Sequence, residues 1–211
     1  MWTIFVDGIA ALLNQLAAWL DGSYGLAVIA LAMTVRLTLL PMTLHAAEQG
    51  WLRQRKLAAL NPLLERLREH HAKDPAAHAA AMQSLYREHG IASGLGSGLL
   101  TALVQAPMSA GICAAIRQGV TSTGSFLWIP KLARPDLWLA LLVAAVSMVV
   151  MLFNPMLPEQ VRTLLHWLPV VISFLMVWHV AAGLGLYWLG SGSVTVAQNL
   201  LLRQRVRRLP V

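Results

Sequence analysis

The stretch AVIALAMTVRLTLLPM, residues 27–42, sets one arginine, Arg36, inside an otherwise apolar run. With its flanks it forms an apolar segment over 24–44, close to the roughly 20 residues that cross the hydrocarbon core of a bilayer. An arginine at the bilayer centre costs about 2.5–3.5 kcal/mol on insertion scales. No Asp or Glu lies in the interior of another apolar run to pair with it. Arg36 therefore either faces a water-filled cavity or extends along the helix to the interface.

The composition of the whole chain agrees with a bilayer as its solvent. Of 211 residues, 57% are hydrophobic and only 12% are charged, whereas soluble domains carry about 25% charged residues. The net charge of +7 comes from basic residues beside apolar runs, a placement that suits anionic lipid headgroups rather than DNA. With Cys113 as its single cysteine, the chain has no disulfide framework and no CxxC metal motif.

On both sides of Arg36, the pattern of apolar and charged segments predicts an all-α polytopic membrane protein with one domain. We expect five transmembrane spans, at 24–44, 97–118, 136–153, 163–180 and 183–202. The remaining segments are an amphipathic interfacial helix at 1–22, a charged helical hairpin at 46–90 and a basic tail at 203–211. For the segment at 1–22, the alternative is a short membrane span.

The distribution of Lys and Arg predicts the orientation. Twelve of the sixteen Lys and Arg residues lie on one side of the expected membrane: seven in the hairpin, Arg162, and four in the tail. Basic loops favour the cytoplasmic side, so we expect the N-terminus outside and the C-terminus in the cytoplasm. The first residues lack the positive charge of a signal peptide or a transit peptide, which points to a bacterial plasma membrane.

Two expected spans carry stripes of polar or aromatic residues at helical spacing. The second span holds Ser97, Thr101, Gln105 and Ser109, and the fifth holds Trp188, Ser191, Thr195 and Gln198. The third and fourth spans hold Ser147 and Ser173. These stripes could line one hydrophilic groove with Arg36 at its centre. The alternative is that small and hydroxyl residues pack the helices together.

Catalytic and metal motifs are absent from the sequence. No GxSxG surrounds a serine, and the histidines of the hairpin lack HExxH spacing. We therefore expect no enzyme activity, no metal and no cofactor.

Five stretches, in order along nearly the whole chain, resemble the YidC/Oxa/Alb membrane protein insertase family. They are YGLAVIALAMTVRLTLLPMT at 24–43, KLAALNPLLERLREHHAKDPAAHAAAMQSLYREHG at 56–90, LVQAPM at 103–108, FLWIPKLARPD at 126–136 and AAGLGLYW at 181–188. The chain departs from the family pattern at HGIASGLGSG and GSGSVTVAQN, which favours a divergent, compact member. No segment is long enough for the large external domain of some relatives.

The resemblance implies a protein that inserts and folds membrane proteins without hydrolysing nucleotide. Arg36 would sit in a client-binding groove, together with Thr101, Gln105, Ser109, Trp188, Ser191, Thr195 and Gln198. Its expected partners are nascent membrane protein clients and the lipid bilayer, with the ribosome and a translocation channel as further candidates. The competing hypothesis is a paralogue without insertase activity that binds a partner complex.

Overall fold

The computed structural model describes residues 1–70, 75–89, 96–119, 124–155 and 162–208. These ranges contain helices and no β-strand, as the sequence predicted. The helices are α1 (Trp2–Trp19), α2 (Tyr24–His70), α3 (Pro75–Glu88), α4 (Gly96–Gly119), α5 (Leu137–Phe153), α6 (Arg162–His179) and α7 (Ala182–Val206).

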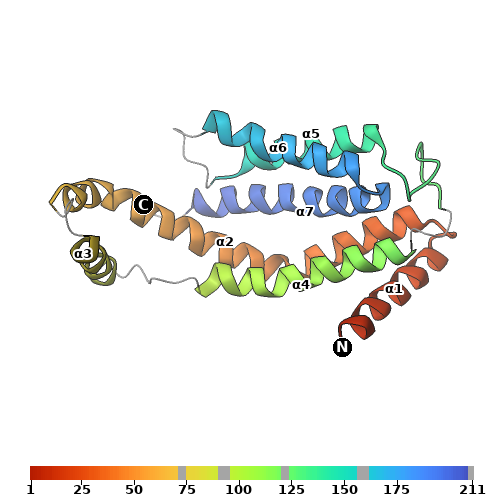
Figure 1. Cartoon of the computed structure of the whole chain (residues 1–211), viewed down its shortest axis with the longest axis horizontal. Coiled ribbons are helices and arrows are strands. Elements are labelled where there is room, and N and C mark those ends of the chain that lie inside the picture. The colour runs from red at the N-terminus through yellow and green to blue at the C-terminus, as the bar shows by residue number, and fades with distance from the viewer. Residues whose placement is uncertain (71–74, 90–95, 120–123, 156–161, 209–211) are drawn as a thin grey trace.

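Helix α7 lies at the centre of the bundle, with α2 and α4 on one side and α5 and α6 on the other (Figure 1). Small residues allow this central place, because helices whose facing residues lack bulk can approach closely. A Cβ added to Gly190 would lie 3.2 Å from Ala32 Cβ of α2, and one added to Gly192 would lie 2.9 Å from Val146 Cγ1 of α5. Helix α7 therefore contacts both halves of the bundle closely.

Helix α2 is longer than the sequence suggested. It runs without a break for 47 residues, which corresponds to about 70 Å at about 1.5 Å per residue. The expected span at 24–44 and the first arm of the hairpin at 46–90 are thus one helix, with Pro41 and Pro62 inside it. Strong helix formers such as Ala, Glu, Gln, Leu and Arg dominate the residues after the apolar run, so the helix continues where polarity changes.

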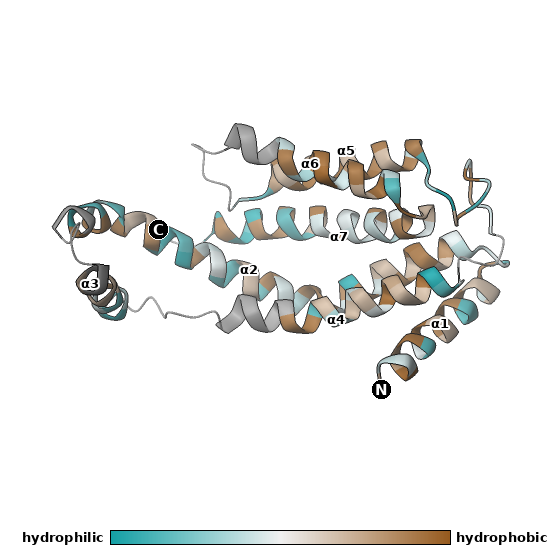
Figure 2. Ribbon diagram, in the orientation of Figure 1, coloured by the Kyte–Doolittle hydropathy of each residue, from teal (hydrophilic) through white to brown (hydrophobic). Residues whose placement is uncertain are grey.

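Apolar residues dominate α5, the stretch Trp167–His179 of α6 and the first half of α2, whereas hydrophilic residues are frequent in the second half of α2 and in α3 (Figure 2). Among the described helices, only Tyr24–Leu67 is both long and apolar enough to cross a membrane by itself. Leu137–Phe153 and Trp167–His179 are apolar but shorter. Each of the five expected spans corresponds to one of these helices. How many helices cross the bilayer stays a prediction.

Backbone hydrogen bonds hold the start of α7 in place. The amides of Ala182 and Gly183 donate to the carbonyl oxygens of Arg134 and Leu132, at 3.0 and 3.1 Å. The same loop ends at Asp136, whose carboxylate accepts from the Leu139 amide at 2.7 Å and caps α5. The loop before α5 therefore sets the positions of both α5 and α7, the two helices that carry much of the site described next.

Candidate functional site

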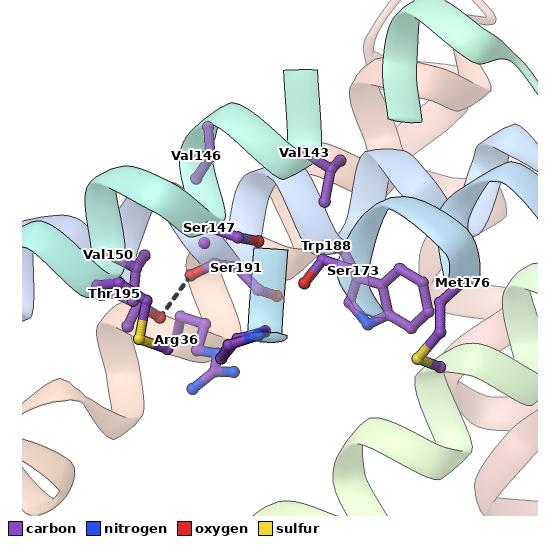
Figure 3. Close-up of a pocket in the computed structure, with 13 residues that line it drawn as sticks. Arg36, Val143, Val146, Ser147, Val150, Ser173, Met176, Trp188, Ser191 and Thr195 are labelled. Atoms are coloured by element: carbon purple, nitrogen blue, oxygen red, sulfur yellow. Dashed lines mark hydrogen bonds between the residues drawn. The ribbon is translucent and has the colours of Figure 1, made fainter. Parts of the chain in front are cut away.

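A cavity of about 360 Å³ lies between α2, α5, α6 and α7 (Figure 3). Most of its wall is apolar, with valines of α5 and Met176 of α6 among the lining residues. Six residues bring polar atoms to the wall: Arg36, Ser147, Ser173, Trp188, Ser191 and Thr195. We call this space the arginine cavity.

Arg36 is half-buried on α2, and its guanidinium is held by a neutral group. With its amide oxygen turned toward α2, Gln105 of α4 accepts hydrogen bonds from both terminal nitrogens of Arg36, from Nη2 at 3.2 Å. Within the described residues Arg36 forms no ion pair, in contrast to Arg205, which lies 3.5 Å from Glu48. A guanidinium has five N–H donors, so one amide oxygen leaves donors and the full positive charge for a ligand.

The hydroxyl groups of the cavity differ in whether they already have a partner. Thr195 Oγ1 donates to the Ser191 carbonyl at 2.9 Å, one turn back along α7. The Ser191 side chain is buried, with 4% of its surface exposed, and its Oγ has no hydrogen-bond partner in the described structure. An unsatisfied buried hydroxyl costs about 1–3 kcal/mol. Ser147, Ser173 and Ser191, from three different helices, point toward the same space (Figure 3).

The structure brings four of the eight stripe residues to the region around Arg36. Arg36, Trp188, Ser191 and Thr195 line the arginine cavity, and Gln105 contacts Arg36. Both stripes therefore contribute to one polar region around Arg36. Ser97 and Thr101 lie outside the residues whose side chains the structure describes.

Two stripe residues take part in interhelical contacts instead. Tyr187 donates from its hydroxyl to Ser109 Oγ at 3.2 Å, which joins α7 to α4. Thr43 Oγ1 donates to Gln198 Oε1, also at 3.2 Å, which joins α2 to α7. The contacts of Ser109 and Gln198 therefore agree with the alternative, in which polar residues pack the helices together.

The sequence did not assign Ser147 and Ser173 to the groove. Ser147 is the one hydroxyl residue of α5, and Ser173 stands alone in the apolar stretch Trp167–His179 of α6, so no stripe points at either. The signal that could have found them is their isolation, because a lone polar residue in a membrane helix tends to face the bundle interior or a water-filled cavity.

Comparison with known proteins places this architecture in a family. Residues 15–208 match the profile of the 60Kd inner membrane protein family. The chain belongs to this family. Among its relatives, the membrane protein insertase YidC 1 of Lactiplantibacillus plantarum is 32% identical over 93% of this chain and 68% of the relative. The Fusobacterium nucleatum insertase YidC is 29% identical over 97% of this chain and 98% of its own length.

A third relative and a solved structure agree with this assignment. The Bacillus subtilis insertase MisCB is 27% identical over 94% of this chain and 78% of its own length. A crystal structure of an active YidC insertase, with its first transmembrane domain resolved, superposes with a TM-score of 0.58 at 24% identity. The match covers 92% of this chain and 45% of that one. The resemblance to the YidC/Oxa/Alb family and the all-helical polytopic membrane fold are thereby confirmed.

Proposed function

We propose that this protein is a membrane protein insertase that passes client helices into the bilayer by way of the arginine cavity. Membership of the 60Kd inner membrane protein family and insertase relatives aligned over nearly the whole chain support the activity. The observation that carries the mechanism is Arg36, a half-buried cation whose described partner is the neutral amide of Gln105. A cation held in this way attracts the acidic or polar segment of a client that must cross.

The packing of the helices suggests how a client would leave. In the described ranges α4 contacts α1, α2 and α7 but neither α5 nor α6. The side of the bundle between α4 and α6 is therefore not closed by helix packing, and a client helix could move from the cavity into lipid there. Burial of the client's apolar residues supplies the driving force, at about 0.8 kcal/mol per CH₂ group, so the cycle needs no nucleotide.

The two ends of the bundle would lie on opposite sides of the membrane. The hydrophilic half of α2, α3 and the end of α7 would lie in the cytoplasm, where the Glu48–Arg205 ion pair joins α2 to α7. The N-terminus would lie outside, in a bacterial plasma membrane. Nascent clients, and with them the ribosome and a translocation channel, would meet the protein on the cytoplasmic side.

Reconstitution tests the activity directly. The purified protein is placed in liposomes, and a purified single-span client is diluted from urea into nucleotide-free buffer outside them. We expect the client to become protected from protease in proportion to the amount of protein reconstituted. Empty liposomes, and liposomes that hold an unrelated helical membrane protein, serve as controls. Protection no greater than in these controls, with folded protein and several clients, would favour the partner-binding paralogue instead.

Gln105 offers a test of the cavity itself. Changing Gln105 to Glu places a fixed carboxylate against Arg36, and this carboxylate competes with the client's acidic segment for the guanidinium. We expect insertion of an acidic-tailed client to fall about tenfold, since a charged partner binds a guanidinium about 1.4 kcal/mol or more better than a neutral one. Protease protection in the reconstituted system measures the change.

Matched variants make this result specific. Gln105→Leu removes the partner without adding charge, so insertion of the same client should be retained or increased. Gln198→Glu adds the same charge beside Thr43, about 10 Å along α2 from Arg36, and should have a much smaller effect. Equal losses in Gln105→Glu and Gln198→Glu would contradict a competition at Arg36.

A further inference from the structure

The serine residues of the arginine cavity form a group that the role of Arg36 does not explain. Ser147 of α5, Ser173 of α6 and Ser191 of α7 point toward one space, on a wall that is mostly apolar (Figure 3). We call these three residues the serine cluster. Because they come from three helices, their meeting is a product of the tertiary fold rather than of one helix's periodicity.

Ser191 differs from its neighbours on α7. In membrane helices a hydroxyl usually bonds the carbonyl one turn back, as Ser193 Oγ does to Leu189 O at 2.9 Å and Thr195 Oγ1 does to Ser191 O at 2.9 Å. The Ser191 hydroxyl makes no such bond, although its residue is only 4% exposed. It is therefore a buried donor and acceptor that lines the cavity with its hydrogen-bonding capacity unused.

The chemistry of the serine cluster defines the group that fits it. A hydroxyl both donates and accepts but carries no charge, so it pairs well with a carboxamide or a peptide group, each of which also does both. Arg36 on the same cavity disfavours a cation and attracts an anion to itself. The part of the cavity that faces α5 and α6 is thus suited to uncharged polar groups.

We propose that the serine cluster is a separate subsite of the cavity, which binds uncharged amide groups of the client segment that crosses the membrane. The amides are those of Asn and Gln side chains and of exposed peptide bonds. This inference rests on the proposed insertase function. It divides recognition in two: Arg36 binds acidic groups, and the serine cluster binds neutral polar groups that would otherwise enter the membrane without hydrogen bonds.

Two clients that differ only in the translocated tail test the division. One tail is rich in Asp and the other in Asn, and both are inserted into liposomes that hold wild type, the Ser147→Ala/Ser173→Ala/Ser191→Ala variant or Arg36→Ala. We expect the triple serine variant to lower insertion of the Asn client about fivefold, which corresponds to the loss of about one neutral hydrogen bond. Insertion of the Asp client should fall less than about twofold. Arg36→Ala should give the opposite pattern.

Ser193→Ala is the matched control, since Ser193 is exposed on the same helix and its hydroxyl already has a partner. It should leave both clients unchanged. Thermal unfolding of Ser191→Ala separates binding from structure: removal of an unpartnered hydroxyl should keep or raise the midpoint, whereas loss of a structural hydrogen bond would lower it.

The possible outcomes distinguish the two levels of the proposal. If wild type inserts both clients and the triple serine variant reduces them equally or not at all, the subsite is overturned and the insertase function stands. A lowered midpoint for Ser191→Ala together with equal losses would make the serine a packing residue. If wild type inserts neither client, the insertase function fails, and the subsite fails with it.

Discussion

Replacing Arg36 by alanine is expected to lower insertion of an acidic-tailed client at least tenfold. A charge-assisted hydrogen bond contributes about 1.5–3 kcal/mol, and about 1.4 kcal/mol corresponds to a factor of ten. Arg36 is the charged residue of the arginine cavity among the described residues, so no neighbouring cation on that wall takes its place. The measurement is protease protection of the client in liposomes of matched protein content.

Arg36→Lys should retain part of the activity, because lysine keeps the charge but loses the planar fork that binds a carboxylate with two hydrogen bonds. The control is Arg134→Ala, which removes an exposed arginine from the loop before α5. A thermal unfolding midpoint no lower than that of wild type is expected for Arg36→Ala, since a cation inside an apolar bundle is costly. Full activity of the alanine variant with acidic clients would contradict the proposed role.

The second large effect is on stability, at Gly185. This glycine is buried where α7 meets α5 and α6, and a Cβ placed on it would lie 2.7 Å from Leu139 Cδ2 and 2.9 Å from Val177 Cγ1. Leu139 and Val177 are fully buried, so they have little room to move. We expect Gly185→Val to destabilise the protein by about 1–3 kcal/mol through overpacking and to lower its thermal unfolding midpoint in detergent.

Gly8→Val provides the matched comparison for this change. Gly8 lies on α1 with no atom within 4 Å of an added Cβ, so the same substitution meets open space and should change the midpoint little. Both variants replace a helical glycine by valine, and the difference between them isolates the packing term from helix propensity. Similar midpoints for the two variants would mean that α5, α6 and α7 can separate at Gly185 without loss.

Apolar length and charge predicted where the helices lie, but not that one helix continues past the expected span at 24–44. The change from apolar to polar residues near His45 resembles the end of a span, yet α2 continues to His70. Hydropathy reports where a helix leaves the bilayer, whereas backbone hydrogen bonding and propensity decide where it ends. The two positions need not coincide.

For the site, too, the sequence predicted one feature and could not predict another. Helical spacing correctly grouped Ser191, Thr195 and Gln198 on one side of α7, because residues three or four apart share a face. It could not tell that Gln198 would meet Thr43 of α2 while Ser191 lines the cavity. Which neighbour each residue meets depends on helix crossing and register, and these come from long-range packing that a single helix's pattern does not contain.

The bonds that hold the start of α7 are made entirely by main-chain atoms, from Ala182 to Arg134 and from Gly183 to Leu132. Any non-proline residue at 182 or 183 supplies the same amide, and every residue at 132 or 134 supplies the same carbonyl. The exposed side chain at 134 is therefore free to vary during evolution without shifting the register of α7. A substitution at 134 can therefore change the outer surface while Ser191 and Thr195 keep their places in the interior.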